Sequence, residues 1–90
     1  MKKSHRKLEQ QLKVLACHRR LAILAYLKRN KTGIVSDIAD DIGIRIETAS
    51  QHLAKLKAAE IVEYNKRGRY ATYRLSLRQE EPVKKVIGML

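Results

Sequence analysis

The sequence is poor in aromatic residues and in cysteine. Its 90 residues include no tryptophan and no phenylalanine, and Cys17 is the single cysteine. One cysteine cannot form a disulfide within the chain, which is typical of a reducing compartment, and we therefore expect a cytoplasmic protein. We expect Cys17 to be a small buried hydrophobic residue, although a thiol at a helix start could also have a lowered pKa and sense oxidants.

Long apolar runs are also absent. No stretch of the sequence approaches the roughly 20 apolar residues that a membrane-spanning helix needs. The basic N-terminus is followed by an amphipathic helical pattern without a small-residue cleavage site, so we expect no signal peptide and no membrane partner. There is no internal repeat and no low-complexity segment, and we interpret residues 1–90 as a single domain.

Acidic residues are scarce relative to basic ones. The chain has 20 Lys and Arg against 9 Asp and Glu, a formal net charge of +11. An apolar fraction of 44% is too high for a disordered basic tail. A folded basic domain points to a polyanionic partner, most often nucleic acid, although the charge could serve solubility alone. RNA is disfavoured because its binding sites usually present aromatic side chains, and Tyr73 is expected to be internal.

Two helical patterns separated by a glycine occupy residues 36–61. The first is short and amphipathic, from Asp37 to Ile42, and we expect Ser36 to cap it. Gly43 can take the left-handed conformation that ends this helix. The second pattern covers residues 46–59, with apolar residues at three- and four-residue steps. Two such helices joined by a tight turn indicate a helix-turn-helix.

Three further helical patterns flank this unit. Residues 4–16 and residues 79–90 each carry a narrow apolar stripe, whereas residues 18–29 are apolar on most of their surface. The broad coverage predicts that the helix at 18–29 is central and buried. Residues 30–33 have turn chemistry, and residues 34–35 are expected to be extended.

The hydrophobic period changes to 2 after the helix-turn-helix. Residues 61–65 and 70–77 are predicted strands, and the Gly-containing turn between them carries Lys66, Arg67 and Arg69. The core face of the second strand is expected to hold Ala71, Tyr73, Leu75 and Leu77. The predicted fold is therefore mainly α with a small β-hairpin, in the order α-α-α-α-β-β-α, which is a winged helix-turn-helix.

Over roughly residues 12–77 the chain resembles the ArsR-type (arsenical-resistance repressor-like) winged-helix transcriptional regulators. The resemblance rests on the segments RRLAILAYL, VSDIADDIGI, TASQHLAKLKAAEIV and RYATYRL. The chain departs from the family pattern at Arg45, where a capping serine is usual. It also departs at Glu60, where glycine is preferred and a left-handed conformation costs on the order of 1 kcal/mol. The resemblance implies a homodimer, built from the first and last helices, that binds double-stranded DNA.

The apolar stripes of the terminal helices, at about residues 4–16 and 79–90, agree with dimerisation. A chain of this size builds only a modest core alone, so its stripes suit a second copy. The alternative is that they close the core of the single chain. The predicted dimer-interface residues are Leu8, Leu12, Leu15, Val83, Val86, Ile87 and Leu90.

The polar face of the helix at 46–59 is the predicted DNA-reading surface, unless it is an ordinary solvated face. Gln51 can bind adenine through two hydrogen bonds, and Glu47 can accept one from cytosine. Lys55 suits phosphate, and the turn cations can follow the backbone or enter the minor groove. The predicted DNA-binding residues are Arg45, Ile46, Glu47, Thr48, Ser50, Gln51, Lys55, Lys66, Arg67 and Arg69. Further phosphate contacts, or only a solvated surface, could come from Lys2, Lys3, Arg6, Lys7, Arg19 and Arg20.

Two metal sites are known in the family that the chain resembles, and the sequence lacks the ligands of both. The positions of the cysteine site hold Ile34 and Ser36, and the last helix has no His or Asp. Since Cys17 and His18 point about 100° apart on a helix, they make a poor ligand pair. We expect no metal and no other cofactor, and no small-molecule effector is identifiable. His52 is expected to pack or touch DNA near the core edge.

Catalytic patterns are missing as well. The sequence shows no phosphate-binding loop, no nucleophile with a base and no paired carboxylates, so we do not expect an enzyme. The favoured function is a sequence-specific, homodimeric transcriptional regulator without the family's metal site. The alternatives are a non-specific architectural or chromatin-like DNA-binding protein and a winged-helix module for protein contacts.

Overall fold

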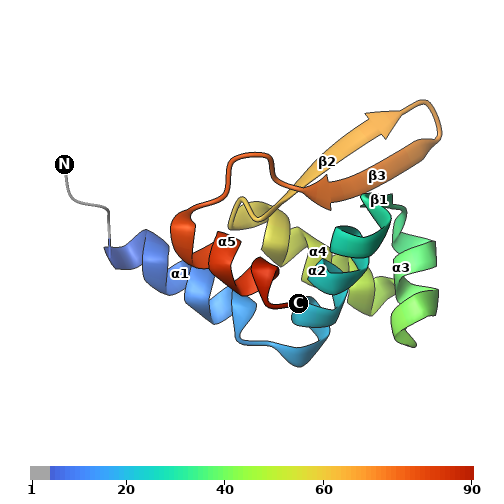
Figure 1. Cartoon of the computed structure of the whole chain (residues 1–90). Helices are drawn as coiled ribbons and strands as arrows, with labels where there is room; N and C mark the ends of the chain where they lie inside the picture. The colour runs from blue at the N-terminus through green and yellow to red at the C-terminus, as the bar shows by residue number, and fades with distance from the viewer. Residues whose placement is uncertain (1–4) are drawn as a thin grey trace.

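The computed structural model describes residues 5–90 (Figure 1), so the predicted cap Ser4 and the basic residues Lys2 and Lys3 lie outside the described residues. The elements, in order, are α1 (His5–Leu15), α2 (His18–Asn30), β1 (Thr32–Gly33), α3 (Val35–Ile42), α4 (Ile46–Ala58), β2 (Val62–Arg67), β3 (Tyr70–Leu75) and α5 (Glu81–Gly88). The prediction of a mainly α fold with a small hairpin is confirmed. Within residues 5–90, no helix is long and apolar enough to cross a membrane.

The small sheet has one strand more than predicted. Its order is β1-β3-β2 and both pairings are antiparallel, with Gly33 opposite Tyr73. The prediction of a loop over residues 30–33 is therefore wrong for Thr32 and Gly33. A side chain at position 33 would not fit, because a Cβ there would lie 2.7 Å from Cε1 of Tyr26. Glycine thus lets β1 pass close to α2.

Helix α3 begins earlier than its sequence suggests. The residue before the first helical turn is Ile34, and the N–H of Ile38 donates to the Ile34 carbonyl at 3.1 Å. Ser36 lies inside the first turn, so the prediction that it caps the helix is wrong, and so is an extended Val35. Val35 packs against the core, which draws it into the helix. Gly43 ends α3 in the left-handed conformation, as predicted, with φ 81° and ψ 40°.

The core is built around α2, as its broad apolar surface predicted. Its buried residues pack with those of α4 and with residues from the start of β2 and from α5. The fully buried large side chains are Ile23, Leu24, Leu27, Ile38, Leu53, Leu56, Ile61 and Val83. Figure 1 shows the hairpin of β2 and β3 extending away from this helical body.

The hairpin differs from its prediction at both ends. Lys66 and Arg67 belong to β2, and the turn is formed by Gly68, with φ 57°, and Arg69. At the other end β3 stops at Leu75, and Leu77 is 77% exposed instead of facing the core. The chain turns away at Leu77 because its N–H donates to the Glu63 carboxylate at 3.2 Å.

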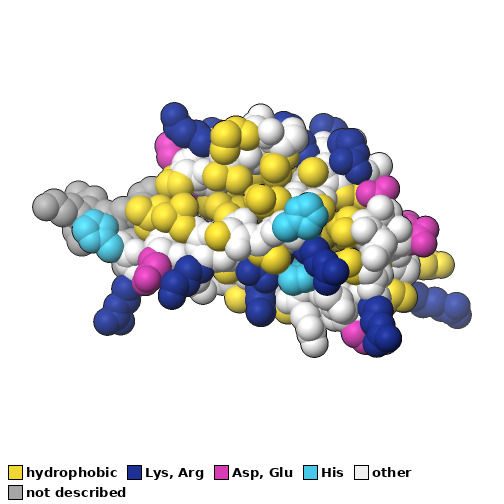
Figure 2. Space-filling view, turned by 90° about the horizontal axis from the view of Figure 1, so that it is seen from below, with side chains coloured by type: hydrophobic (Ala, Val, Ile, Leu, Met, Phe, Trp, Pro, Cys, Tyr) yellow, Lys and Arg dark blue, Asp and Glu magenta, His cyan; other side chains and the backbone are white. Residues whose placement is uncertain are grey.

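The predicted interface residues on α1 and α5 divide into two groups. Leu15, Val83 and Ile87 are buried in the core of the single chain and offer little surface to a partner, which corrects the prediction for these three. Leu12 is 48% exposed and Leu90 is also exposed. Leu8 and Val86 are half-buried. Helix α5 contacts α1 (Figure 1), and hydrophobic side chains form a patch near the N-terminal end of the face in Figure 2.

Candidate nucleic-acid interface

Helix α4 is fixed by one face and exposed on the other. Ala49, Leu53 and Leu56 are fully buried. Their spacing turns the opposite face outward, as expected from the helical period. The predicted reading residues that are exposed on α4 are Ile46, Glu47, Ser50, Gln51 and Lys55. Thr48 is half-buried, and Arg45, the residue before the helix, is exposed.

The outward polar side chains of α4 are not used within the protein. Among residues 5–90, no side-chain hydrogen bond or ion pair holds Glu47, Ser50 or Gln51. Each therefore keeps its full hydrogen-bonding capacity for a partner. The buried face of the helix is meanwhile packed at three successive turns, so these side chains project from a fixed support.

The tip of the hairpin carries the second group of predicted residues. Lys66, Arg67 and Arg69 are all exposed around the Gly68 turn. Tyr70, opposite Arg67, is 66% exposed, which makes it the most exposed aromatic side chain in residues 5–90. The site prediction omitted Tyr70, although the strand alternation already placed it on the solvent face. A large apolar ring beside three cations suits a groove wall of sugar and phosphate.

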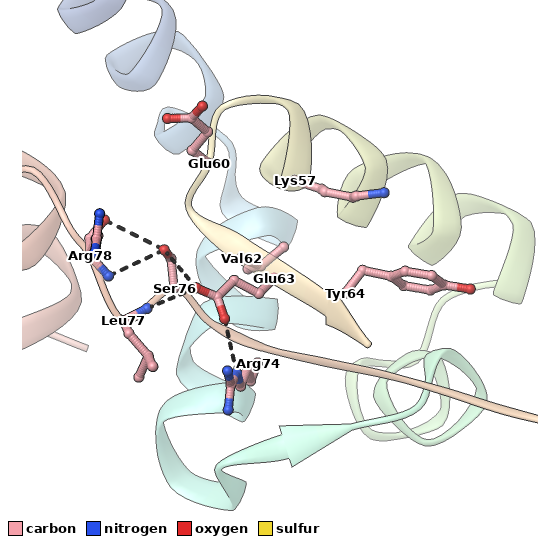
Figure 3. A pocket seen from close by; sticks show the side chains of 9 residues that line it. All are labelled: Lys57, Glu60, Val62, Glu63, Tyr64, Arg74, Ser76, Leu77 and Arg78. Carbon is pink, nitrogen blue, oxygen red and sulfur yellow. Dashed lines mark hydrogen bonds and ion pairs between the residues drawn. The ribbon is translucent and has the colours of Figure 1, made fainter. Parts of the chain in front are cut away.

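A network at the base of the hairpin sets its direction (Figure 3). The Glu63 carboxylate accepts hydrogen bonds from Arg74 Nε at 3.0 Å, Ser76 Oγ at 3.3 Å and the Leu77 N–H. The Leu77 N–H, followed by the Arg74 side chain, lowers the pKa of Glu63. These residues line part of an open cleft of about 630 Å³.

Aromatic contacts join this hairpin to α4. The rings of Tyr64 and Tyr73 lie 5.1 Å apart, and Nζ of Lys57 lies 4.9 Å from the centre of the Tyr64 ring. Lys57 belongs to the last turn of α4, so a cation–π contact links the helix to the strand. The contact therefore ties the last turn of α4 to the first half of β2.

The chain matches known DNA-binding regulators in sequence and in structure. Residues 19–65, just over half of the chain, match the family model described as a helix-turn-helix domain. Reduced HlyU from Vibrio cholerae is 32% identical, with 94% of this chain and 85% of that chain covered and a TM-score of 0.79. The transcriptional regulator HlyU from Vibrio vulnificus is 30% identical, with 93% and 83% covered and a TM-score of 0.76.

A third similar structure carries a family name. It is the homodimeric winged helix-turn-helix DNA-binding domain of a possible ArsR-family transcriptional regulator from Mycobacterium bovis. That domain is 29% identical to this chain, with 99% of this chain and 84% of that chain covered and a TM-score of 0.78. This chain belongs to the ArsR-type winged helix-turn-helix transcriptional regulators. Its relatives are regulators, a class without enzymatic activity.

Two of the basic residues that we considered for phosphate contacts, Arg20 and Lys7, have partners within the regulator itself. Arg20 donates from Nε to the Val14 carbonyl at 2.6 Å, and its Nη1 lies 3.2 Å from His52 Nδ1. Lys7 contacts Glu60 at 3.2 Å and Glu80 at 3.6 Å. The hydrogen bond to Glu60 is the main cause that raises the pKa of Lys7.

The family's cysteine positions lie at the start of α3 in this ArsR-type chain. Ile34 is half-buried before the helix, and Ser36 is exposed in its first turn. In the part of the chain that the structure describes, no three or more His, Cys, Asp or Glu residues are grouped so as to hold a metal ion.

Cys17 does not belong to the core, which corrects that prediction. It is half-buried at the residue before the first turn of α2. Burial alone would raise the pKa of the thiol, but hydrogen bonds from the backbone of Arg20 and Arg19, together with nearby cations, outweigh it and lower the pKa.

Proposed function

We propose that this regulator binds a specific duplex DNA sequence through the outer face of α4. The observation that carries the proposal is the set of exposed polar side chains that have no partner within residues 5–90, Glu47, Ser50 and Gln51, on a helix whose other face is fully buried. Such a helix can enter the major groove, where amide and carboxylate groups distinguish base pairs. The wing cations Lys66, Arg67 and Arg69, with Arg45 and Lys55, would bind the backbone and set the register.

We also propose that the regulator acts as a homodimer. The exposed apolar residues Leu12 and Leu90, with the half-buried Leu8 and Val86, form a surface on α1 and α5 that a second copy would cover. The similar domain from Mycobacterium bovis is homodimeric, which supports this arrangement. A two-fold dimer presents two reading helices to half-sites about one helical turn apart, so the operator should be close to palindromic.

The proposed regulator works without a metal at either of the two family sites. Ile34 and Ser36 cannot bind a soft metal as paired thiolates would, and α5 supplies no His or Asp. A thiolate-binding metal should therefore leave DNA affinity unchanged. No small-molecule effector is part of the proposal.

The test is selection of bound duplexes from a random pool, followed by affinity measurements with the selected duplex and a scrambled one. We expect an enriched, nearly palindromic sequence. Gln51→Ala should lose about 1–3 kcal/mol of binding free energy per half-site on the selected duplex and little on the scrambled one. Gln10→Ala, the same change at an exposed position of α1, is the matched control.

The outcomes separate the alternatives. If no sequence is enriched but duplexes bind tightly, the protein is a non-specific architectural binder. If Gln51→Ala and Gln10→Ala bind the selected duplex equally well, α4 does not read bases, and a winged-helix module for protein contacts becomes the better interpretation.

A further inference from the structure

Arg20, a residue of α2, connects α1 with α4. It lies in the first turn of α2 and is half-buried. Its Nε donates to the carbonyl oxygen of Val14 in α1, and its Nη1 lies at hydrogen-bond distance from Nδ1 of His52 in α4. The guanidinium therefore forms a bridge from the end of α1 to the middle of the reading helix.

The bridge completes the end of α1. The last carbonyl groups of a helix have no partner within it. Here the Leu12 and Leu15 carbonyls accept from the N–H groups of Ala16 and Cys17. The Val14 carbonyl accepts from Arg20 at 2.6 Å. Val14 lies two residues after Leu12, the most exposed leucine of α1. The bridge therefore begins within one helical turn of the proposed dimer surface.

The other end of the bridge determines the state of His52. A guanidinium can only donate hydrogen bonds, so Nδ1 of His52 must be the acceptor and must carry no proton. The neutral ring then holds its proton on Nε2. His52 is half-buried directly after Gln51, so its attachment fixes the part of α4 that carries the proposed base-reading residue.

The surroundings of His52 favour this neutral ring. Arg19 and Arg20 face it from α2, and Lys55 faces it from its own helix. Burial and then these cations lower the pKa of His52. Figure 2 shows histidine side chains among Lys and Arg side chains on the underside of the molecule. Protonation would place a cation against Arg20 and remove the acceptor that Arg20 uses.

We propose that Arg20 is a positioning residue that holds the reading helix to the end of α1 through neutral His52, and that a proton added to His52 releases this hold and weakens DNA binding. In this step Nδ1 of His52 takes a proton from solvent, and Nη1 of Arg20 loses its acceptor and donates to water instead. The effect on DNA rests on the proposed function, whereas the bridge itself does not.

The sign of the pH dependence follows from the lowered pKa of His52. The folded chain binds this proton less readily than the unfolded chain. The contribution of the bridge is therefore fully present above the ordinary pKa of histidine and is lost as pH falls through the lowered one. At neutral pH the bridge is intact.

The bridge is tested first in the free protein, by the imidazole ¹⁵N shifts of His52 across a pH titration. We expect the wild-type ring to carry its proton on Nε2 when neutral, and Arg20→Met to remove that preference and raise the pKa of His52. Arg19→Met is the matched control, because it removes a neighbouring arginine that forms no side-chain hydrogen bond within residues 5–90. A wild-type ring protonated on Nδ1, or equal tautomer shifts in the two variants, would overturn the proposal.

The consequence for DNA is tested with His52→Gln and His52→Leu. Glutamine offers an oxygen that accepts from Arg20 but does not titrate, whereas leucine offers none. At about pH 7.5 we expect His52→Gln to bind the selected duplex nearly as well as wild type and His52→Leu to bind at least about tenfold more weakly, the lower end of what one hydrogen bond to a charged group contributes. As pH falls from about 7.5 to about one unit below the pKa that the ¹⁵N titration gives for His52, the wild type should lose a similar factor relative to His52→Gln.

His5 and His18 remain in every variant, so their contribution cancels in this ratio. A wild-type to His52→Gln affinity ratio that stays constant with pH would overturn the coupling while leaving the proposed function intact. Failure of every protein to bind any duplex would instead overturn the proposed function and, with it, the effect on DNA. The ¹⁵N titration decides the bridge in either case.

Discussion

The backbone at Glu60 takes a conformation that glycine would adopt more easily. Its φ is 63°, in the left-handed region, between the end of α4 and the start of β2. The turn closes with the Ile61 N–H donating to the Leu56 carbonyl at 2.9 Å, so the conformation is required by the path of the chain. The departure from the family pattern at this position therefore carries a local cost.

Replacing this residue tests that cost. Glu60→Gly should stabilise the regulator by about 0.5–1 kcal/mol, because a Cβ in the left-handed region costs on the order of 1 kcal/mol and the exposed ion pair to Lys7 contributes little. Urea unfolding at neutral pH measures the change. Glu60→Ala is the matched control, since it removes the same ion pair but keeps the Cβ. Equal stability of the two variants would show that the backbone of position 60 is not strained.

At the scale of elements, Lys28 attaches α5 to α2. Its Nζ lies 3.2 Å from the Ile87 carbonyl, 3.4 Å from that of Gly88 and 3.0 Å from that of Leu90. An ammonium group among the last carbonyls of a helix satisfies acceptors that have no helical partner and favours the negative end of the helix dipole. This contact holds one of the two helices proposed for the dimer.

Removing the ammonium group should loosen α5 selectively. We expect Lys28→Met to lower the free energy of unfolding by about 1 kcal/mol, the usual contribution of such hydrogen bonds, and to speed amide exchange in α5 more than in α4. Hydrogen exchange read residue by residue measures this. Lys84→Met, an exposed lysine on α5 itself, should change neither quantity appreciably. Uniform acceleration in both helices would contradict a local attachment.

The elements that could be predicted from the sequence are those with a local signal. The apolar period of α2 and α4 and the left-handed Gly43 depend on neighbouring residues only. Strand β1 could not be predicted, because two residues have no period and its partner Arg74 lies far along the chain. The start of α3 was misplaced since packing of Val35 against the core outweighed the capping preference of Ser36.

The same distinction holds for the candidate site. Exposure of Gln51 follows from helical spacing alone and was predicted. The engagement of Arg20 with His52 joins residues 32 positions apart, and no periodic pattern reports such a contact. The exposure of Tyr70 could be predicted, because strand alternation places its aromatic ring on the solvent face. Its role in binding could not be predicted, because that depends on the position of the hairpin tip.

For the whole molecule, the proposed dimer depends on the apolar surface that folding leaves uncovered on α1 and α5. Leu12→Asp should give a monomer in sedimentation equilibrium, because it places a carboxylate in the centre of that surface, where burying an unpaired charge is costly. Leu77→Asp is the matched control, a leucine more exposed than Leu12 that lies outside α1 and α5, and should remain dimeric. A dimeric Leu12→Asp would remove α1 from the interface.

The net charge of +11 per chain predicts that DNA binding weakens steeply with salt. Each phosphate neutralised contributes about 0.9 to the negative slope of log K against log salt. If the wing contacts the backbone, the double variant Lys66→Gln/Arg67→Gln removes four phosphate contacts from a dimer and should reduce the magnitude of the slope by about 3.6. Fluorescence anisotropy across a salt series with the selected duplex gives the slope.

Net charge and contact position can be separated by a second double variant. Lys84→Gln/Lys85→Gln removes the same charge from exposed positions on α5, and we expect it to leave the slope nearly unchanged. Counterions are released only where a cation meets a phosphate, so removing a contact reduces the magnitude of the slope and removing a distant charge does not. Equal reductions by the two variants would mean that the basic surface acts as a diffuse field. A wild-type slope near zero would remove the electrostatic basis of DNA binding altogether.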